Sequence, residues 1–172
     1  MIKTELYLNL SDPRWKTVFP EAQEVSEQVV SLVVNFINDN EPLDFFALDK
    51  TLTFNLCLSN DSEVQNLNQT FRQINKPTNV LSFANIDDED FAERSKIEPE
   101  IEMGDMIIAL ETMQHEAQEK RLPLYNHFCH LLTHSVLHLL GYDHIQDDEA
   151  QHMEDFEIKI LRQLKINNPY EE

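Results

Sequence analysis

Apolar and polar residues alternate in two stretches of the chain, TELYLNL at residues 4–10 and TLTFNLCL at residues 51–58. Successive side chains of a β-strand point to opposite faces, so this two-residue period predicts two strands that are buried on one side. Two shorter apolar stretches, at residues 79–83 and 104–110, predict two more strands. The chain is therefore expected to build a sheet of about four strands.

Elsewhere the apolar residues recur at every third or fourth position, which predicts amphipathic helices. The first helix begins after Pro13 and Pro20, and Pro123 separates two others because proline interrupts a helix. Asn60 or Asp61 supplies the N-cap of a short helix. In all, about five helices are expected, at residues 21–37, 60–71, 111–121, 124–140 and 147–164.

The acidic segment 86–103 contains DDEDFAER and EPEIE, and we interpret it as a solvated loop. Helices lie both between the strands and together at the end of the chain, an order that predicts an α+β fold with a mixed sheet. At 172 residues the chain has the length of one ordinary domain, so residues 1–172 are expected to form a single domain. The only two glycines, Gly104 and Gly141, are candidates for backbone positions that a side chain would obstruct.

Composition narrows the expected compartment and partners. The chain has 13 basic and 32 acidic residues, a net charge of −19 that repels phosphate backbones and membrane surfaces at long range. Cys57 and Cys129 lie in apolar stretches without paired spacing, so we expect buried, reduced thiols and no disulfide partner. No apolar stretch approaches the roughly 20 residues of a membrane span, and the N-terminus lacks the pattern of a secretory signal. We therefore expect a soluble, cytoplasmic protein.

The stretch HSVLHLLGYDH, residues 134–144, places three histidines where one metal ion can reach them. His134 and His138 are one helical turn apart, and Gly141 then ends the helix, since glycine is preferred in a left-handed C-cap. The chain can turn back there and bring His144 to the same point. This spacing matches the zinc ligands of metzincin proteases, and three ligands leave a fourth position open for water, as in catalytic sites.

Imidazole ligands suit Zn²⁺, so one Zn²⁺ per chain is expected at the end of the long helix, although nickel, copper or iron suit the same ligands. Zinc lowers the pKa of bound water toward about 7, which indicates a hydrolase. A zinc protease also needs a carboxylate base after its first histidine, and Ser135 cannot serve as one. His127 and His130 lie further from the turn and are expected to support the ligands or to pack, while His115 and His152 have no partner at useful spacing.

Three separated motifs, FRQINKPTNVLSF, GDMII and HSVLHLLGYDH followed by DDEA, together resemble the YbeY family of bacterial zinc-dependent endoribonucleases, also called ribosomal RNA maturation factors. The resemblance extends from about residue 51 through the last helix. It implies an endoribonuclease that is specific for single strands and acts in ribosomal RNA processing, especially at the 3′ end of the small-subunit RNA, and in the disposal of defective ribosomes. It also implies that His134, His138 and His144 bind the metal.

The family's functional arginine carries over to Arg72, whose planar donors suit a phosphate oxygen, and Lys76 in the same loop is a candidate for holding the RNA backbone. Two positions depart from the family, which usually has glycine in place of Ser135 and proline in place of Ala84. We expect the serine to affect the approach of the substrate to the helix more than metal binding.

Two aspartates leave alternatives open. Asp143 can orient a ligand imidazole, because metal-binding histidines usually donate their second N–H to a carboxylate or carbonyl, or it can cap the turn. Asp105 opens a strand and can either line the pocket or tie down the neighbouring loop.

The acidic composition constrains any RNA hypothesis. A chain at −19 binds free RNA weakly through its general surface, so it needs a small positive site or a basic partner. Ribosomal proteins are mostly basic, and we expect single-stranded RNA, ribosomal RNA and the small ribosomal subunit with its proteins as partners. Two alternatives remain: a metallohydrolase of peptides, disfavoured by Ser135, and a non-catalytic zinc module that binds ribosomes, disfavoured by Arg72 and the open metal position.

Overall fold

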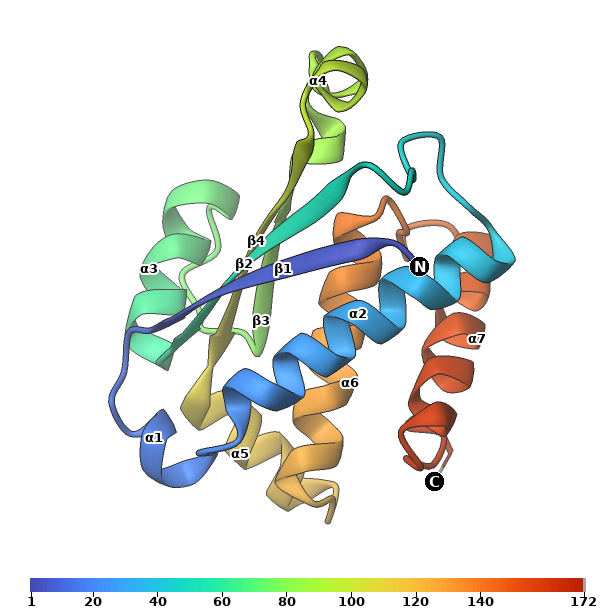
Figure 1. Ribbon diagram of the computed structural model, residues 1–172. Helices are drawn as coiled ribbons and strands as arrows, with labels where there is room; N and C mark the ends of the chain where they lie inside the picture. Colours follow the sequence, from blue (N-terminus) through green and yellow to red (C-terminus); the bar gives the residue numbers. More distant parts are fainter. Residues whose placement is uncertain (172) are drawn as a thin grey trace.

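The computed structural model describes residues 1–171, which form a four-stranded sheet flanked by helices (Figure 1). The strands follow one another across the sheet in the order β1-β2-β4-β3. The first three of these run parallel, and the edge strand β3 pairs with β4 in the antiparallel direction. The expected mixed sheet is thus confirmed, with strands at β1 (Lys3–Leu10), β2 (Thr51–Ser59), β3 (Val80–Ala84) and β4 (Glu100–Ala109).

Residues 1–171 contain seven α-helices, two more than the hydrophobic pattern predicts. The five predicted helices are present with ends shifted by at most three residues, and the additional ones are the single turn α1 and the short helix α4. The helices are α1 (Trp15–Val18), α2 (Ala22–Asn40), α3 (Asp61–Arg72), α4 (Phe91–Ile97), α5 (Leu110–Glu119), α6 (Leu124–Leu139) and α7 (Asp147–Gln163), with a 3₁₀ turn at Asn85–Asp87.

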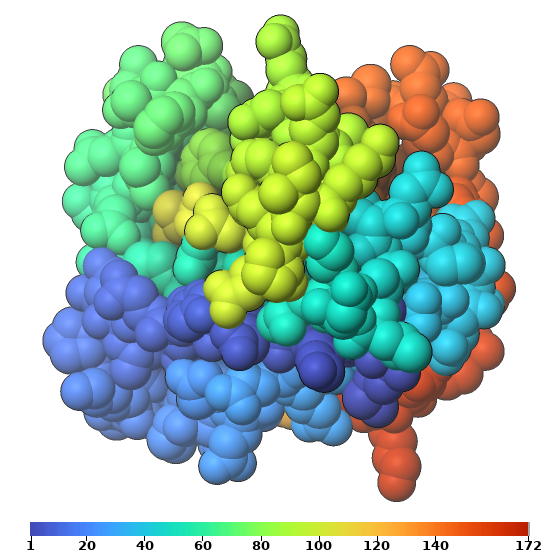
Figure 2. Space-filling model, turned by 45° about the horizontal axis from the view of Figure 1, so that its top comes forward, coloured from blue at the N-terminus to red at the C-terminus, as the bar shows by residue number. Residues whose placement is uncertain are grey.

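The acidic segment 86–103 is not a loop, and that prediction was wrong. Its helix α4 is anchored by Phe91, which is buried and packs its ring 5.2 Å from that of Phe45. The Lys50 ammonium donates to the carbonyls of Lys96 and Glu98 and holds the end of the helix. Figure 2 shows the segment on the outer surface, beside the residues that lead into β2. One buried ring and the hydrogen bonds of Lys50 therefore hold a helix within this acidic segment.

Strand β4 begins four residues earlier than predicted, because its first residues also alternate between buried and exposed positions. Gly104 sits at an irregularity of this strand, opposite Ala84, with a φ of +138°. A Cβ on Gly104 would lie 2.1 Å from the carbonyl oxygen of Phe83 and 3.1 Å from Leu139 of α6. Glycine therefore permits β3, β4 and α6 to approach one another, as expected of a position that a side chain would obstruct.

The helices are divided unequally between the two faces of the sheet. The main core lies on the face covered by α2 and α6, with α7 packed outside them, whereas α3 covers part of the other face with a small cluster of Val64, Leu81 and Ala109 (Figure 1). Helix α6 contacts α2, α5, α7 and β3, so most of its surface is buried. Its partly exposed histidines consequently face the one side that the other elements leave open.

Both cysteines are free thiols: Cys129 is buried, whereas Cys57 is only half-buried, contrary to expectation. Within residues 1–171, none of the helices combines the length and apolar character needed to cross a membrane.

Candidate metal centre

The end of α6 brings the three predicted histidines together. The N–H of Gly141 donates to the carbonyl of His138, and the N–H of Tyr142 donates to that of Leu137, the paired bonds of a Schellman motif. Gly141 has a φ of +102°, which a side chain would strain. The reversed chain carries the His144 ring to 5.3 Å from the His134 ring and 6.3 Å from the His138 ring, measured between centroids.

The donor atoms of His138, Asp143 and His144 all lie within 4.8 Å of one another, so this group can hold a metal ion. His134 lies beside the group but outside that distance. Asp143 also caps the turn, because its carboxylate accepts the backbone N–H of His144 at 2.6 Å. Sequence reasoning considered Asp143 only as an orienting or capping residue and did not propose it as a donor.

His134 is held by a residue that the sequence analysis missed, Glu157 of α7. Its carboxylate, with a side chain that is 1% exposed, accepts from Nδ1 of His134 at 3.3 Å, from Nε2 of His130 at 2.9 Å and from the Tyr170 hydroxyl at 3.0 Å. Burial alone would raise the pKa of Glu157, but hydrogen bonds from the two histidines outweigh it and lower the pKa to about 2. The bond to Nδ1 leaves Nε2 of His134 for a ligand.

Glu157 could have been noticed from its position in the sequence. Met153, Phe156 and Ile160 form the buried face of α7, and Glu157 stands within that apolar stripe. A carboxylate there requires a buried partner, since burial of an unpaired charge is costly. The pattern marks the residue but does not identify the partner.

The protonation of His138 suits a metal ligand. Burial lowers the pKa of His138, and the neighbouring His134 and His144 lower it further, while Asp143 opposes the shift. Its Nδ1 is buried without a hydrogen-bond partner among the described residues. A neutral imidazole and a carboxylate are the donor types that Zn²⁺ and related ions bind, so the side chains present fit such an ion.

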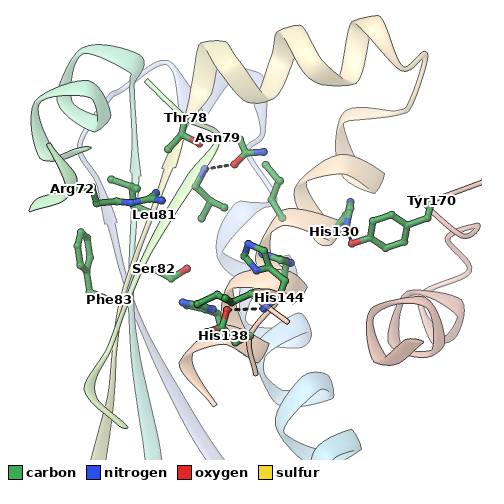
Figure 3. A pocket seen from close by; sticks show the side chains of 15 residues that line it. Arg72, Thr78, Asn79, Leu81, Ser82, Phe83, His130, His138, His144 and Tyr170 are labelled. Carbon is green, nitrogen blue, oxygen red and sulfur yellow. Dashed lines mark hydrogen bonds between the residues drawn. The ribbon is translucent and has the colours of Figure 1, made fainter. Parts of the chain in front are cut away.

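A cavity of about 590 Å³ opens over these histidines (Figure 3). Arg72, Ser82 and Phe83 line it from the side of α3 and β3, opposite the three histidines. The guanidinium of Arg72 forms no ion pair or hydrogen bond with another residue of the described chain, so it is not neutralised by one of the many acids. A free cation and a cluster of metal donors thus share one cavity.

Lys76 and Asp105 lie elsewhere. Lys76 is exposed and does not line the cavity, although its carbonyl accepts from Asn68 and so ties its loop to α3. Asp105 lies on the other face of the sheet, where it lines a separate hollow with Tyr7 and Phe71.

The remaining histidines are paired with acids. His127 is buried against Glu116 at 2.8 Å, whereas His115 and His152 pair on the surface with Glu119 and Glu41. Of these remaining histidines in the described chain, His130 alone joins His134 in bonding Glu157, which matches the supporting role expected of it.

Comparison with known proteins identifies the family. The family described as endoribonuclease YbeY matches residues 16–165. The chain belongs to the YbeY family. Among the YbeY relatives, the "Endoribonuclease YbeY" of Zymomonas mobilis is 43% identical over 87% of this chain and 81% of its own length. That of Paramagnetospirillum magneticum is 35% identical over 99% of this chain and 98% of its own length.

The fold has a counterpart among solved structures. The solution structure of TM1509 from Thermotoga maritima has a TM-score of 0.50 to this YbeY chain, with 17% identity over 98% of this chain and all of the other. At that level of identity the likeness concerns the fold alone.

Ser135, noted in the sequence as a departure from the family, lies on α6. It is fully buried, and its hydroxyl lies 2.6 Å from that of Ser82 on β3. The pair links the ligand helix to the edge strand beside His134. Ser135 therefore has a structural partner. Its hydroxyl is not the carboxylate base that a zinc protease requires.

Proposed function

We propose that this chain is a metal-dependent endoribonuclease that cleaves single-stranded RNA. The observation that carries the proposal is the shared cavity, in which an unpaired arginine faces a cluster of metal donors. A phosphodiester needs both an activated nucleophile and compensation for the charge that develops on phosphorus. Membership of a family whose relatives are named endoribonucleases supports RNA as the substrate.

His134, His138 and His144 are proposed to hold one Zn²⁺, with Asp143 near the same ion. Zinc bound there supplies a Lewis acid and lowers the pKa of water. The protein's own part is to orient the ligands: Glu157 holds His134 through Nδ1, and the turn at Gly141 positions His144.

Arg72 is proposed to bind a non-bridging oxygen of the scissile phosphate, since its planar donors suit such an oxygen and no acid of residues 1–171 neutralises it. Lys76 is proposed to hold the RNA backbone outside the cavity, where it is exposed.

The biological substrate is proposed to be ribosomal RNA, in maturation of the 3′ end of the small-subunit RNA and in ribosome quality control in the cytoplasm. The net charge of −19 supports delivery by the small ribosomal subunit, whose basic proteins would attract this chain. We expect RNA within ribosomal particles to be cut faster than the same short strand alone. Equal rates on the two substrates would contradict delivery by the ribosome.

The deciding experiment incubates the zinc-loaded protein with a labelled single-stranded RNA and, separately, with a mixture of peptides. We compare the wild type with His138→Ala and Arg72→Ala. The expected result is cleavage of RNA alone, lost in the first variant and reduced by about 10- to 100-fold in the second. Cleavage that persists in both variants would indicate a contaminating nuclease. A wild-type protein that binds one zinc but cuts neither substrate would favour a binding module.

A further inference from the structure

A second cavity, of about 1020 Å³, lies where the C-terminal ends of α5 and α7 meet. Three cations line it, Lys120, Arg121 and Arg162, and none forms an ion pair with the described acids. Glu171 is the only acidic residue among the described residues that line it. In a chain with 13 basic and 32 acidic residues, this is a local excess of positive charge.

The basic cavity adjoins the cavity over the histidines, which we call the metal cavity. His130 and Tyr170 line both, so the two cavities share a wall. In Figure 3, Arg72 lies on one side of His138 and His144, and His130 and Tyr170 lie on the other. An RNA strand that extended from the metal cavity past His130 and Tyr170 would reach the basic cavity. The Tyr170 ring, at 44% exposure, offers an aromatic surface at the junction.

Arg121 is held in a backbone conformation that favours glycine. Its φ is +55°, and it occupies the left-handed position of a Schellman motif, with its N–H donating to Gln118 and that of Leu122 to Ala117. Glycine adopts this left-handed conformation without the steric cost that a Cβ brings. The backbone alone would be more stable with glycine, so the arginine side chain is retained at some cost to stability.

We propose that the basic cavity binds the phosphate backbone of single-stranded RNA next to the nucleotide at the metal centre. Lys120, Arg121 and Arg162 would neutralise phosphates, and Tyr170 would stack a base between the two sites. The cavity provides the local positive site that an RNA enzyme of net charge −19 needs. This inference rests on the proposed ribonuclease function and extends it by giving the path that the RNA follows across the protein surface.

A purely structural role for these cations is the competing explanation. Lys120 and Arg121 follow the C-terminus of α5, and Arg162 lies in the last turn of α7, where positive charge favours the helix dipole. The two explanations differ in a measurable way. Removing a cation that stabilises a helix lowers the melting temperature of the protein. Removing a cation that binds RNA raises the Kd for RNA.

Arg121→Gly separates the two explanations, because glycine removes the backbone strain at this left-handed position and the substitution also removes the positive charge. Lys165→Gly is the matched control: Lys165 has a φ of +62° in the same motif at the end of α7, but it does not line the cavity. Binding of a fluorescein-labelled single-stranded RNA of about 12 nucleotides is measured by anisotropy with metal-free protein, which binds without cutting. Thermal unfolding is measured in parallel.

We expect Arg121→Gly to raise the Kd for RNA about threefold and to keep or raise the melting temperature, with Lys165→Gly changing the Kd by less than about 1.5-fold. The triple variant Lys120→Gln, Arg121→Gly, Arg162→Gln should weaken binding about tenfold and reduce the salt slope by about 2, near 0.7 for each lost phosphate contact. Tyr170→Leu tests stacking and should raise the Kd about fivefold.

Three outcomes would overturn the inference: equal loss of affinity in the two glycine variants, an unchanged salt slope in the triple variant, or equal affinity for an acidic peptide of the same charge. Failure of the proposed function would look different. In that case the zinc-loaded wild type would not cut RNA, while the metal-free binding data would stand unaffected.

Discussion

Two of the histidine–carboxylate pairs on helix α6, His127–Glu116 and His134–Glu157, lie two turns apart in contrasting surroundings. His127 is 1% exposed and bonds Glu116 through Nε2, and its Nδ1 is buried without a partner in the described chain. His134 is 28% exposed and bonds Glu157 through Nδ1, and its ring lines the metal cavity. The carboxylate is common to both pairs, so it does not distinguish a metal ligand from a packing residue. Access of the second ring nitrogen to a cavity that holds other donors makes the difference.

The largest expected contrast comes from removing each histidine. His134→Ala should lose bound zinc and lower RNA cleavage by about 10²-fold or more, because one ligand and its orienting bond disappear together. His127→Ala should keep the zinc and instead lower the free energy of unfolding by about 1–3 kcal/mol, since Glu116 loses a buried partner. Metal content by mass spectrometry and chemical denaturation check the two results. Zinc loss in both variants would show that the pairs are equivalent.

Removing the carboxylates should give a smaller contrast. Glu157→Gln keeps the size of the side chain but removes its charge, and the affinity for zinc should fall by about 10- to 100-fold. Glu116→Gln is the matched change at the other pair and should alter that affinity by less than about twofold. Competition with a chelator measures both affinities. The melting temperature of the metal-free proteins controls for misfolding.

The pH dependence of stability sharpens the same comparison. The pKa of Glu157 is lowered to about 2 from an ordinary 4.5, so between these values the unfolded chain binds a proton that the folded chain does not. Stability from Glu157 is therefore fully present above about pH 4.5 and is lost as the pH falls toward 2, by up to about 1.4 kcal/mol per pH unit. Metal-free wild type should show this slope in denaturation experiments, and Glu157→Gln should lack it. The same pH dependence of stability in wild type and in Glu157→Gln would contradict the role assigned to Glu157.

The smallest effect is expected beside the second pair, at Ser135. Ser135→Gly removes the hydroxyl bond to Ser82 and adds a glycine within α6, so the free energy of unfolding should fall by about 1–2 kcal/mol. Zinc affinity should stay within about twofold, because the serine donates nothing to the metal donors. RNA cleavage should also stay within about twofold, in contrast to the effect on substrate approach expected from the sequence, because Ser135 is fully buried. Ser82→Ala removes the same bond without the glycine and separates the two contributions. A large gain in cleavage with glycine would show that Ser135 restricts the substrate.

Local pattern predicted most of the fold. Strands and helices with a clear period of two or of three to four residues, such as β2 and α2, lie close to their expected bounds. The start of β4 was missed because Ile101 and Met103 alternate with Glu100 and Glu102, and this alternation was interpreted as charge alone. Helix α4 was missed for a similar reason, since a single anchor, Phe91, supplies most of its burial.

In the candidate site, too, a local pattern predicted some residues, and others depend on tertiary packing. The three histidines lie within eleven residues, so helix geometry and one glycine sufficed to bring them together. Glu157 bonds a residue 23 positions away, a contact that depends on how α7 packs on α6 and that no local pattern specifies. Arg72 reaches the cavity around the edge of the sheet, and only the family resemblance pointed to it.

Gly104 has a consequence for the width of the metal cavity. A Cβ at Gly104 would meet Phe83, on the strand that forms one wall, and Leu139, the neighbour of His138 on the helix that forms the other. A single methyl group at this point would act as a spacer between the two walls and move the arginine side of the cavity away from the metal side. The spacing between Arg72 and the histidines therefore depends in part on a residue that bears no functional group and does not line the cavity.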